Sequence, residues 1–128
     1  MVNTIHYMIK DSGPLERLFS GNAVAKIMDF LITAKDWDYS QSDIAKNAGV
    51  SVRTVQREMS KLLDSKLVKQ VRTVGNAKMY RLNKPHMIAL SAENFALELA
   101  QEQIRVAAAL TPPKVKLFKI SNKRKAST

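Results

Sequence analysis

The sequence contains no cysteine and only two histidines, His6 and His86. Without thiols the chain forms neither disulfides nor thiolate metal sites, and it lacks a cysteine nucleophile. The two histidines stand far apart, and neither has a cluster of carboxylates around it. Paired carboxylates, a glycine-rich phosphate loop and a nucleophile with a plausible base are all missing. We therefore expect no enzyme activity, no metal and no cofactor.

Long apolar runs are also missing. The longest unbroken run, Val106 to Leu110, has five residues, whereas a helix needs about 20 to cross a bilayer. The first residues, 1–14, mix apolar with charged and polar side chains and contain no apolar stretch typical of a secretory signal. We therefore expect a cytoplasmic, nucleoid-associated protein without a membrane contact.

Acidic residues are scarce where basic residues gather. Residues 44–84 carry 10 basic and 2 acidic side chains, and residues 114–128 carry 6 basic and no acidic ones. These two segments hold the whole excess of the +10 net charge, because the rest of the 128 residues is mildly acidic. A surface that needs charge only for solubility mixes both signs, so basic blocks indicate a polyanionic partner. Nucleic acid is the leading candidate; chance clustering is the alternative.

Apolar residues make up 45% of the chain and charged residues 25%, which is ordinary globular usage and predicts one domain with one core. Between residues 15 and 32, apolar side chains recur every three or four positions, as on one face of a helix. Asn22 is a good N-cap for a helix that ends near Ala34. Residues 36–39 are predicted to form a turn and a short extended piece.

Two further helices are predicted after this turn. Ser40 stands three residues before Asp43, a variant of the capping box, at the start of a helix that ends at Gly49. Ser51 is expected to cap the next helix, which continues to about Ser65.

The spacing between Ala45, Gly49 and Val55 predicts that these two helices cross as a helix-turn-helix. Two helices that cross steeply need a small residue where their backbones approach, here Ala45. They also need a turn residue free to take a positive φ, here Gly49, and an apolar residue that locks the second helix, here Val55.

The second half of the chain changes period. Residues 68–74 and 78–82 alternate apolar and polar side chains and predict a β-hairpin that turns at residues 75–77. A long helix is expected to start between residues 83 and 91 and to end before Pro112. The predicted fold class is mainly α with a small β-hairpin (α+β).

This order of elements resembles the winged-helix transcription regulators, of ArsR/MarR-like, archaeal type, from about Leu18 to Leu110. The resemblance rests on Ser40-Gln41-Ser42-Asp43-Ile44-Ala45, Ala48-Gly49-Val50-Ser51, Thr54-Val55, Leu67-Val68 and the wing sequence Val74-Gly75-Asn76-Ala77-Lys78-Met79-Tyr80-Arg81-Leu82. It implies a winged helix-turn-helix with a long C-terminal helix, and sequence-specific binding of double-stranded DNA as a homodimer.

We expect four parts: an irregular N-terminal segment (1–14), a winged helix-turn-helix DNA-binding domain (15–83), a C-terminal dimerisation helix (84–111) and a basic tail (112–128). The tail can lie along phosphates or dock on a protein partner through its interleaved apolar residues. Two other functions stay open: a DNA-binding replication or partition protein of a plasmid or virus, and a protein-interaction winged helix in transcription machinery.

Candidate DNA contacts follow from placing the helix after Ser51 at about 100° per residue with Val55 facing inward. The alternative for each cation is a solvated helix face. The predicted base readers are Arg53, Thr54, Gln56 and Arg57. The predicted phosphate contacts are Ser40, Gln41, Ser51, Ser60 and Lys61. The predicted wing contacts are Arg72, Asn76, Lys78 and Arg81, although alternation along the strands leaves one of the two arginines as a lateral charge.

The long C-terminal helix has two apolar faces, which need two partners. One can pack on the winged domain and the other is left for a second copy; the alternative is a helix sandwiched within its own domain. The first face comprises Ile88, Ala92, Phe95, Leu99, Val106 and Leu110. The face that we assign to dimerisation comprises Leu90, Leu97, Ile104 and Ala108.

Overall fold

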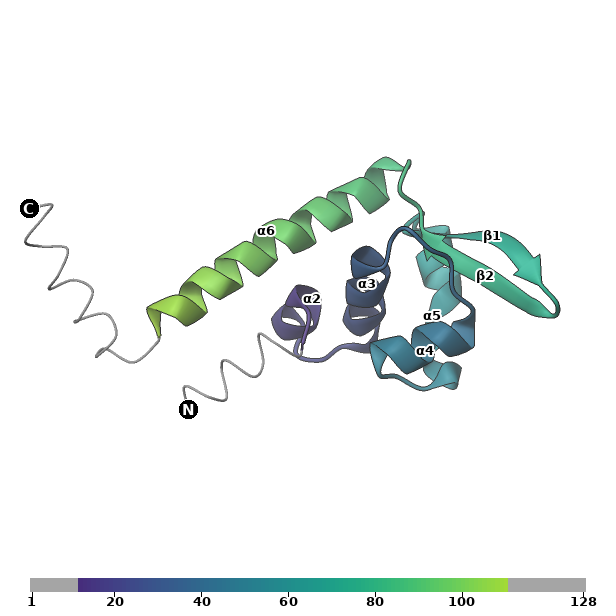
Figure 1. The fold of residues 1–128 in the computed structure, drawn as a ribbon, viewed down its shortest axis with the longest axis horizontal. Helices are drawn as coiled ribbons and strands as arrows, with labels where there is room; N and C mark the ends of the chain where they lie inside the picture. The colour runs from purple at the N-terminus through teal and green to yellow at the C-terminus, as the bar shows by residue number, and fades with distance from the viewer. Residues whose placement is uncertain (1–11, 111–128) are drawn as a thin grey trace, which may run out of the picture.

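The computed structural model describes residues 12–110, so the predictions for the tail and for most of the N-terminal segment lie outside the described residues. The helices and strands follow one another as predicted (Figure 1). Their bounds are α2 (Pro14–Leu18), α3 (Ala23–Thr33), α4 (Gln41–Ala48), α5 (Val52–Asp64), β1 (Val68–Val74), β2 (Ala77–Leu82) and α6 (Met87–Ala109). This order confirms the predicted α+β class with one hairpin and a long C-terminal helix.

The predicted helix starts are confirmed by their caps. The Asn22 side chain accepts hydrogen bonds from the backbone N–H groups of Val24 and Ala25, and the Ser51 side chain accepts one from Thr54. Ser40 and Asp43 form the complete capping box at the start of α4. Each cap satisfies N–H groups that have no partner inside the helix, so these residues set where the chain enters it.

The turn between α4 and α5 has the predicted geometry. Gly49 ends α4 with a φ of +76°, and its N–H donates to the carbonyl of Ala45 at 3.0 Å. Ala45 and Val55 are both buried, which is the arrangement that their spacing predicts. The helix-turn-helix is therefore confirmed.

The hairpin rests on a third extended segment. β1 and β2 pair antiparallel from Val68–Leu82 to Val74–Ala77, with an irregularity between Gln70 and Arg72. The α3–α4 connector (residues 34–39) runs beside β2, where Tyr39 and Tyr80 exchange backbone hydrogen bonds of 2.7 and 2.8 Å. The wing is thus joined to the body of the domain along its second strand.

The core joins α3, α4, α5 and the base of the hairpin. Burial of each large side chain contributes about 1.5–3 kcal/mol relative to exposure, so this cluster dominates the stability of the domain. The largest fully buried side chains are Ile27, Leu31, Ile44, Val55, Leu62, Val68 and Leu82. None of the helices between residues 12 and 110 is long and apolar enough to span a membrane.

α6 extends past the core along α2 and corrects one prediction (Figure 1). Its inward stripe is built on Ala89 and Ala96, which are buried, together with the partly buried Leu99. The expectation that one whole apolar face packs on the domain is wrong for the face of Ile88, Ala92, Phe95, Leu99, Val106 and Leu110, because Ile88, Phe95, Val106 and Leu110 are 46–53% exposed. Small alanines allow close helix approach, and the larger side chains fall on the flanks of this stripe.

The other apolar face of α6 is also exposed. Leu90, Leu97 and Ile104 are 45–54% exposed, so within residues 12–110 the helix is not sandwiched in its own domain. Polar contacts add to the packing of the alanine stripe in holding the helix in place. Arg17 donates from Nε to Oε1 of Gln103 at 2.9 Å, and Lys35 pairs with Glu93.

Candidate nucleic-acid interface

The polar face of α5 is uncovered. Arg53, Gln56, Arg57 and Ser60 are exposed and Thr54 is half-buried, while the apolar face of the same helix is buried in the core. This division follows from the helical period and is the one expected from the sequence. The predicted base readers therefore stand together on one accessible helix face.

The side chains at the two helix starts are engaged in capping. Ser40 Oγ accepts a hydrogen bond from the Asp43 N–H at 3.1 Å, and Ser51 Oγ accepts one from the Thr54 N–H at 3.0 Å. The hydroxyls of Ser51 and Thr54 also bond to each other at 2.8 Å. These hydrogen bonds hold the capping side chains in place at the N-terminal ends of α4 and α5. The helix dipoles are positive at these ends.

A groove of about 390 Å³ lies between α5, the start of α4 and the tip of the wing. It brings together five predicted contacts from three segments: Ser40 and Gln41 at the start of α4, Gln56 on α5, and Asn76 and Lys78 on the wing. The full lining is Ser40, Gln41, Ser42, Val52, Gln56, Asn76, Ala77, Lys78 and Tyr80.

Sequence reasoning missed four members of this lining. Val52 stands one helical turn before Gln56, so the period of the helix was a usable signal for it. Ser42 directly follows two predicted contacts, and Ala77 directly precedes Lys78. Tyr80 gave no signal, because its position depends on the pairing of β2 with the connector.

The two arginines of the wing bind the connector. Arg72 donates to both carboxylate oxygens of Asp38, from Nε at 2.6 Å and from Nη2 at 3.1 Å. Arg81 is half-buried and donates to the main-chain carbonyl of Lys35 at 3.0 Å. The guanidinium of Arg72 lowers the pKa of the Asp38 carboxyl, which therefore keeps its charge to a lower pH than an unpaired carboxyl does. Both arginines tie the wing to the domain in this conformation.

The tip of the wing differs from its base. Asn76 and Lys78 are exposed, and Lys78 makes no ion pair within the part of the chain that the structure describes. A cation without a carboxylate partner carries its full charge to an incoming polyanion. Lys78 is therefore an exposed positive charge near the tip of the wing that no carboxylate of the described residues neutralises.

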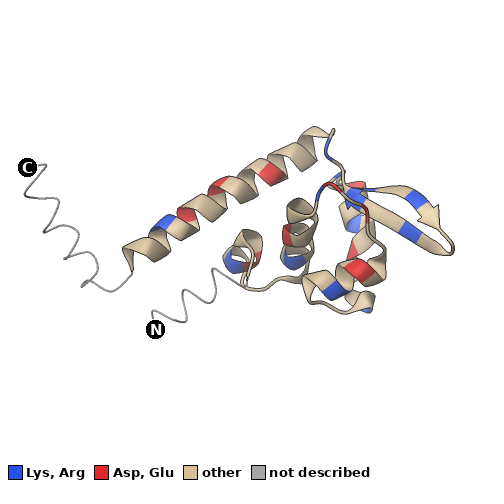
Figure 2. Ribbon diagram, in the orientation of Figure 1, with Lys and Arg blue, Asp and Glu red and all other residues tan. Residues whose placement is uncertain are grey.

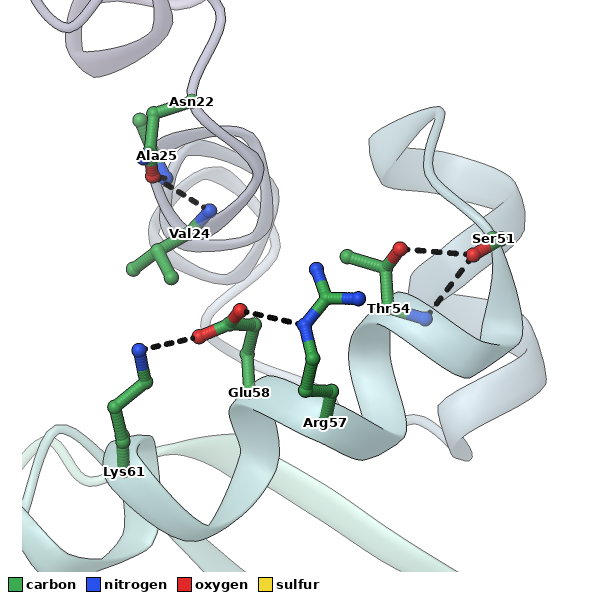
Figure 3. A network of polar contacts seen from close by, with 8 residues as sticks. All are labelled: Asn22, Val24, Ala25, Ser51, Thr54, Arg57, Glu58 and Lys61. Atoms are coloured by element: carbon green, nitrogen blue, oxygen red, sulfur yellow. Dashed lines mark hydrogen bonds and ion pairs between the residues drawn. The ribbon is translucent and has the colours of Figure 1, made fainter.

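On α5, two of the predicted contacts share a carboxylate that sequence reasoning did not single out (Figure 3). Arg57 donates from Nε to Glu58 Oε2 at 3.1 Å, and the Lys61 ammonium lies 2.8 Å from Glu58 Oε1. The pKa of Glu58 is lowered mainly by the hydrogen bond from Lys61 and, to a smaller extent, by the one from Arg57. The spacing was a usable signal only for the contact with Lys61, because residues three positions apart on a helix are neighbours whereas adjacent residues do not face each other.

Charge is distributed unevenly over the molecule. Basic side chains mark the hairpin and α5, whereas acidic side chains dominate along α6 (Figure 2). The basic side is thus the helix-turn-helix and wing side. No group of three or more metal-binding side chains occurs between residues 12 and 110.

Comparison with known proteins gives the fold. No protein-family model and no curated protein matches the chain. Among solved structures, MepR, a transcription regulator of the Staphylococcus aureus multidrug efflux pump MepA, covers 94% of this chain and 87% of its own, at 17% identity and a TM-score of 0.63.

Two further solved structures share this architecture. The adhesin competence repressor AdcR from Streptococcus pyogenes covers 98% of this chain and 90% of its own, at 14% identity and a TM-score of 0.53. A mutant of Lactococcus lactis ZitR covers 78% and 70%, at 13% identity and a TM-score of 0.55. At these identities the likeness concerns the fold, which is the winged helix-turn-helix with a long C-terminal helix.

Proposed function

We propose that this protein is a transcription regulator that binds double-stranded DNA sequence-specifically and acts by occupying its operator, without catalysis. The observation that carries the proposal is the uncovered basic face of α5 beside a groove that the wing tip and the start of α4 complete. A helix of this kind fits the major groove, where hydrogen-bonding side chains read base edges.

The proposed roles follow the position of each side chain. Arg53, Gln56, Arg57 and Thr54 read bases from the major groove, because Arg pairs with guanine and Gln with adenine. Asn76 and Lys78 reach the adjacent minor groove or backbone from the wing. Phosphates are held by Ser40, Gln41, Ser51, Ser60 and Lys61. Arg72 and Arg81 act mainly by holding the wing against the connector.

The proposed functional unit is a homodimer built through α6. Leu90, Leu97, Ile104 and Ala108 follow one another along one flank of the helix, and all four are exposed in the single chain. Two-fold symmetry places the recognition helices about 34–36 Å apart, which requires a pseudo-palindromic operator with half-sites one duplex turn apart, or a multiple of it. In this division residues 15–83 bind DNA and residues 84–111 dimerise.

A binding-site selection with the purified full chain tests the function. We expect enrichment of a pseudo-palindromic duplex, and a logarithm of the binding constant that falls with the logarithm of salt concentration by about 0.9 per phosphate contacted. A pool without enrichment, together with binding that is absent or insensitive to salt, would contradict the proposal. That result would favour a winged helix whose α5 contacts protein.

We also propose that the protein is of archaeal type and that it is located in the cytoplasm in association with the nucleoid.

A further inference from the structure

Glu58 differs from the other acid of α5 by its burial. Glu58 is 9% exposed, whereas Asp64 is exposed at the end of the helix and has no ion pair within residues 12–110. The charge of a buried carboxylate must be matched by partners, because water does not stabilise it there. Its partners are two cations, Arg57 and Lys61, that the proposed function places at DNA.

The geometry leaves both cations at the surface. The Arg57 side chain is 63% exposed and the Lys61 side chain 73% exposed, although each touches the same buried carboxylate. Figure 3 shows the Glu58 carboxylate between the Arg57 guanidinium and the Lys61 ammonium. Only Nε of Arg57 is bonded to Glu58, so its terminal nitrogens point away from this contact. They form the edge that pairs with a guanine or a phosphate.

We propose that Glu58 is a positioning residue that sets how strongly this protein discriminates its operator from other DNA. Glu58 restrains Arg57 and Lys61 in one arrangement and cancels one of their two charges. This inference rests on the proposed function, because it assigns a task within the same DNA-binding surface.

The physical reason is competition for the cations. On an arbitrary duplex, a phosphate that draws Arg57 or Lys61 toward itself must pull that side chain from a carboxylate about 3 Å away. On the operator, a base or phosphate that meets the cations where Glu58 holds them needs no such movement. The side-chain entropy has then been lost on folding rather than on binding. Restraint therefore weakens binding to random DNA more than binding to the operator.

Two variants that change the net charge equally test this inference. Glu58→Gln and Asp64→Asn each remove one negative charge from α5, but only the first releases cations. We expect Glu58→Gln to tighten binding to a random duplex, to steepen its salt dependence by about 0.9 and to lower the ratio of operator to random affinity. Asp64→Asn should leave the slope and the ratio close to those of the wild-type chain. Titrations by fluorescence anisotropy over a series of salt concentrations give both quantities.

Equal behaviour of the two variants would overturn the inference while leaving the proposed function standing. A wild-type chain that binds no duplex would instead overturn the proposed function and the inference with it. Because Glu58→Gln can also impair folding, the wild-type chain supplies a second test by NMR. The Arg57 Nε–H signal should exchange more slowly than that of Arg53, which has no ion pair within the described residues, and should be displaced from it, and both differences should persist with random duplex bound. An Arg57 signal that behaves like that of Arg53 would overturn the inference.

Discussion

Basic residues on the proposed DNA-binding side differ in what each one touches. Arg53 and Lys78 have no ion-pair partner within the described part of the chain. Arg57 shares a buried carboxylate with a lysine, and Arg72 is bound to both oxygens of Asp38. A cation without a partner offers its full charge and all its donors, whereas a paired one offers a fixed position. Substitutions at these sites should therefore have different signatures.

Arg53 gives the simplest test of base reading. Arg53→Ala should cost about 1–3 kcal/mol on the selected operator and relax the preference at one base position. Lys78→Ala is the matched control, because it should weaken operator and random duplex alike and reduce the salt slope by about 1. Competition titrations with single-base operator variants measure both effects. An equal loss on operator and random DNA for Arg53→Ala would show that Arg53 contacts only the backbone.

Gly49 tests the conformation of the turn. Its φ is +76° and a Cβ added there meets no atom within 4 Å, so a substitution is strained by the backbone alone. Gly49→Ala should lower the free energy of unfolding by about 1–2 kcal/mol in urea denaturation. Gly49→Asn should lower it less, since Asn tolerates the left-handed region better. Identical costs for the two variants would mean that something other than φ is responsible.

At the scale of elements, the α3–α4 connector links the wing to α6. The side chain of Lys35 pairs with Glu93 of α6, and its carbonyl accepts a hydrogen bond from Arg81 of the wing. Two further contacts, Asp38 with Arg72 and Tyr39 with Tyr80, join the connector to the hairpin. A hairpin alone is marginally stable, so these contacts keep the wing in position beside α5.

Asp38→Asn should loosen the wing, because it removes the charge that Arg72 binds with two hydrogen bonds. Hydrogen exchange of the amides in β1 and β2 should become faster, with little change in α3 or α4. Asp36→Asn is the control from the same connector, since its contact with Lys84 is largely exposed. Equal exchange in the two variants would show that the Asp38 pair does not hold the wing.

The same pair predicts a dependence on pH. Arg72 lowers the pKa of Asp38 below its ordinary value of 3.8, so the folded chain binds this proton less tightly than the unfolded chain does. The Asp38–Arg72 pair therefore contributes its full stabilisation above pH 3.8, the ordinary pKa of the carboxyl. This contribution is lost as the pH falls through the lower pKa of Asp38 in the folded state. Asp38→Asn should therefore show a smaller fall in Tm between pH 5 and pH 3 than the wild-type chain, measured by circular dichroism.

At the scale of the whole molecule, charge and apolar surface are separated. The helix-turn-helix and wing carry the basic side chains, and α6 carries acidic ones together with two exposed apolar flanks (Figure 2). Large exposed apolar surface is unusual on a monomer and indicates an interface. Separation of this kind allows one end of the molecule to bind DNA while the other end binds a second copy.

Leu97→Glu tests the dimer. A charge in the middle of the proposed interface should shift the chain from dimer to monomer in sedimentation equilibrium and weaken operator binding much more than binding to a half-site. Ser91→Glu introduces the same charge at an exposed polar position of α6 and should leave the mass unchanged. A wild-type chain that sediments as a monomer, or a Leu97→Glu variant that remains dimeric, would contradict the proposed interface.

Features that depend on neighbouring residues were determined by the sequence itself. The caps at Asn22, Ser40 and Ser51, the turn at Gly49 and the alternation of the hairpin involve residues a few positions apart. Local hydrogen bonds and backbone preferences act within the same few positions, so they can be deduced without knowing how the chain folds back on itself. The helix-turn-helix and the wing were predictable for this reason, and the exposed face of α5 was predictable because its polar residues lie opposite its apolar ones at the helical period.

Only the tertiary structure decided which side chains meet across the chain. Asp38 and Arg72 are 34 residues apart, Lys35 and Glu93 are 58 apart, and Arg17 and Gln103 are 86 apart. The inward stripe of α6 was likewise set by the neighbours against which it packs, because periodicity gives the relative directions of side chains on a helix but not the side that faces a partner. The burial of Glu58 has the same origin, because it depends on how α5 packs in the core, although Lys61 and Arg57, which pair with it, belong to its own helix.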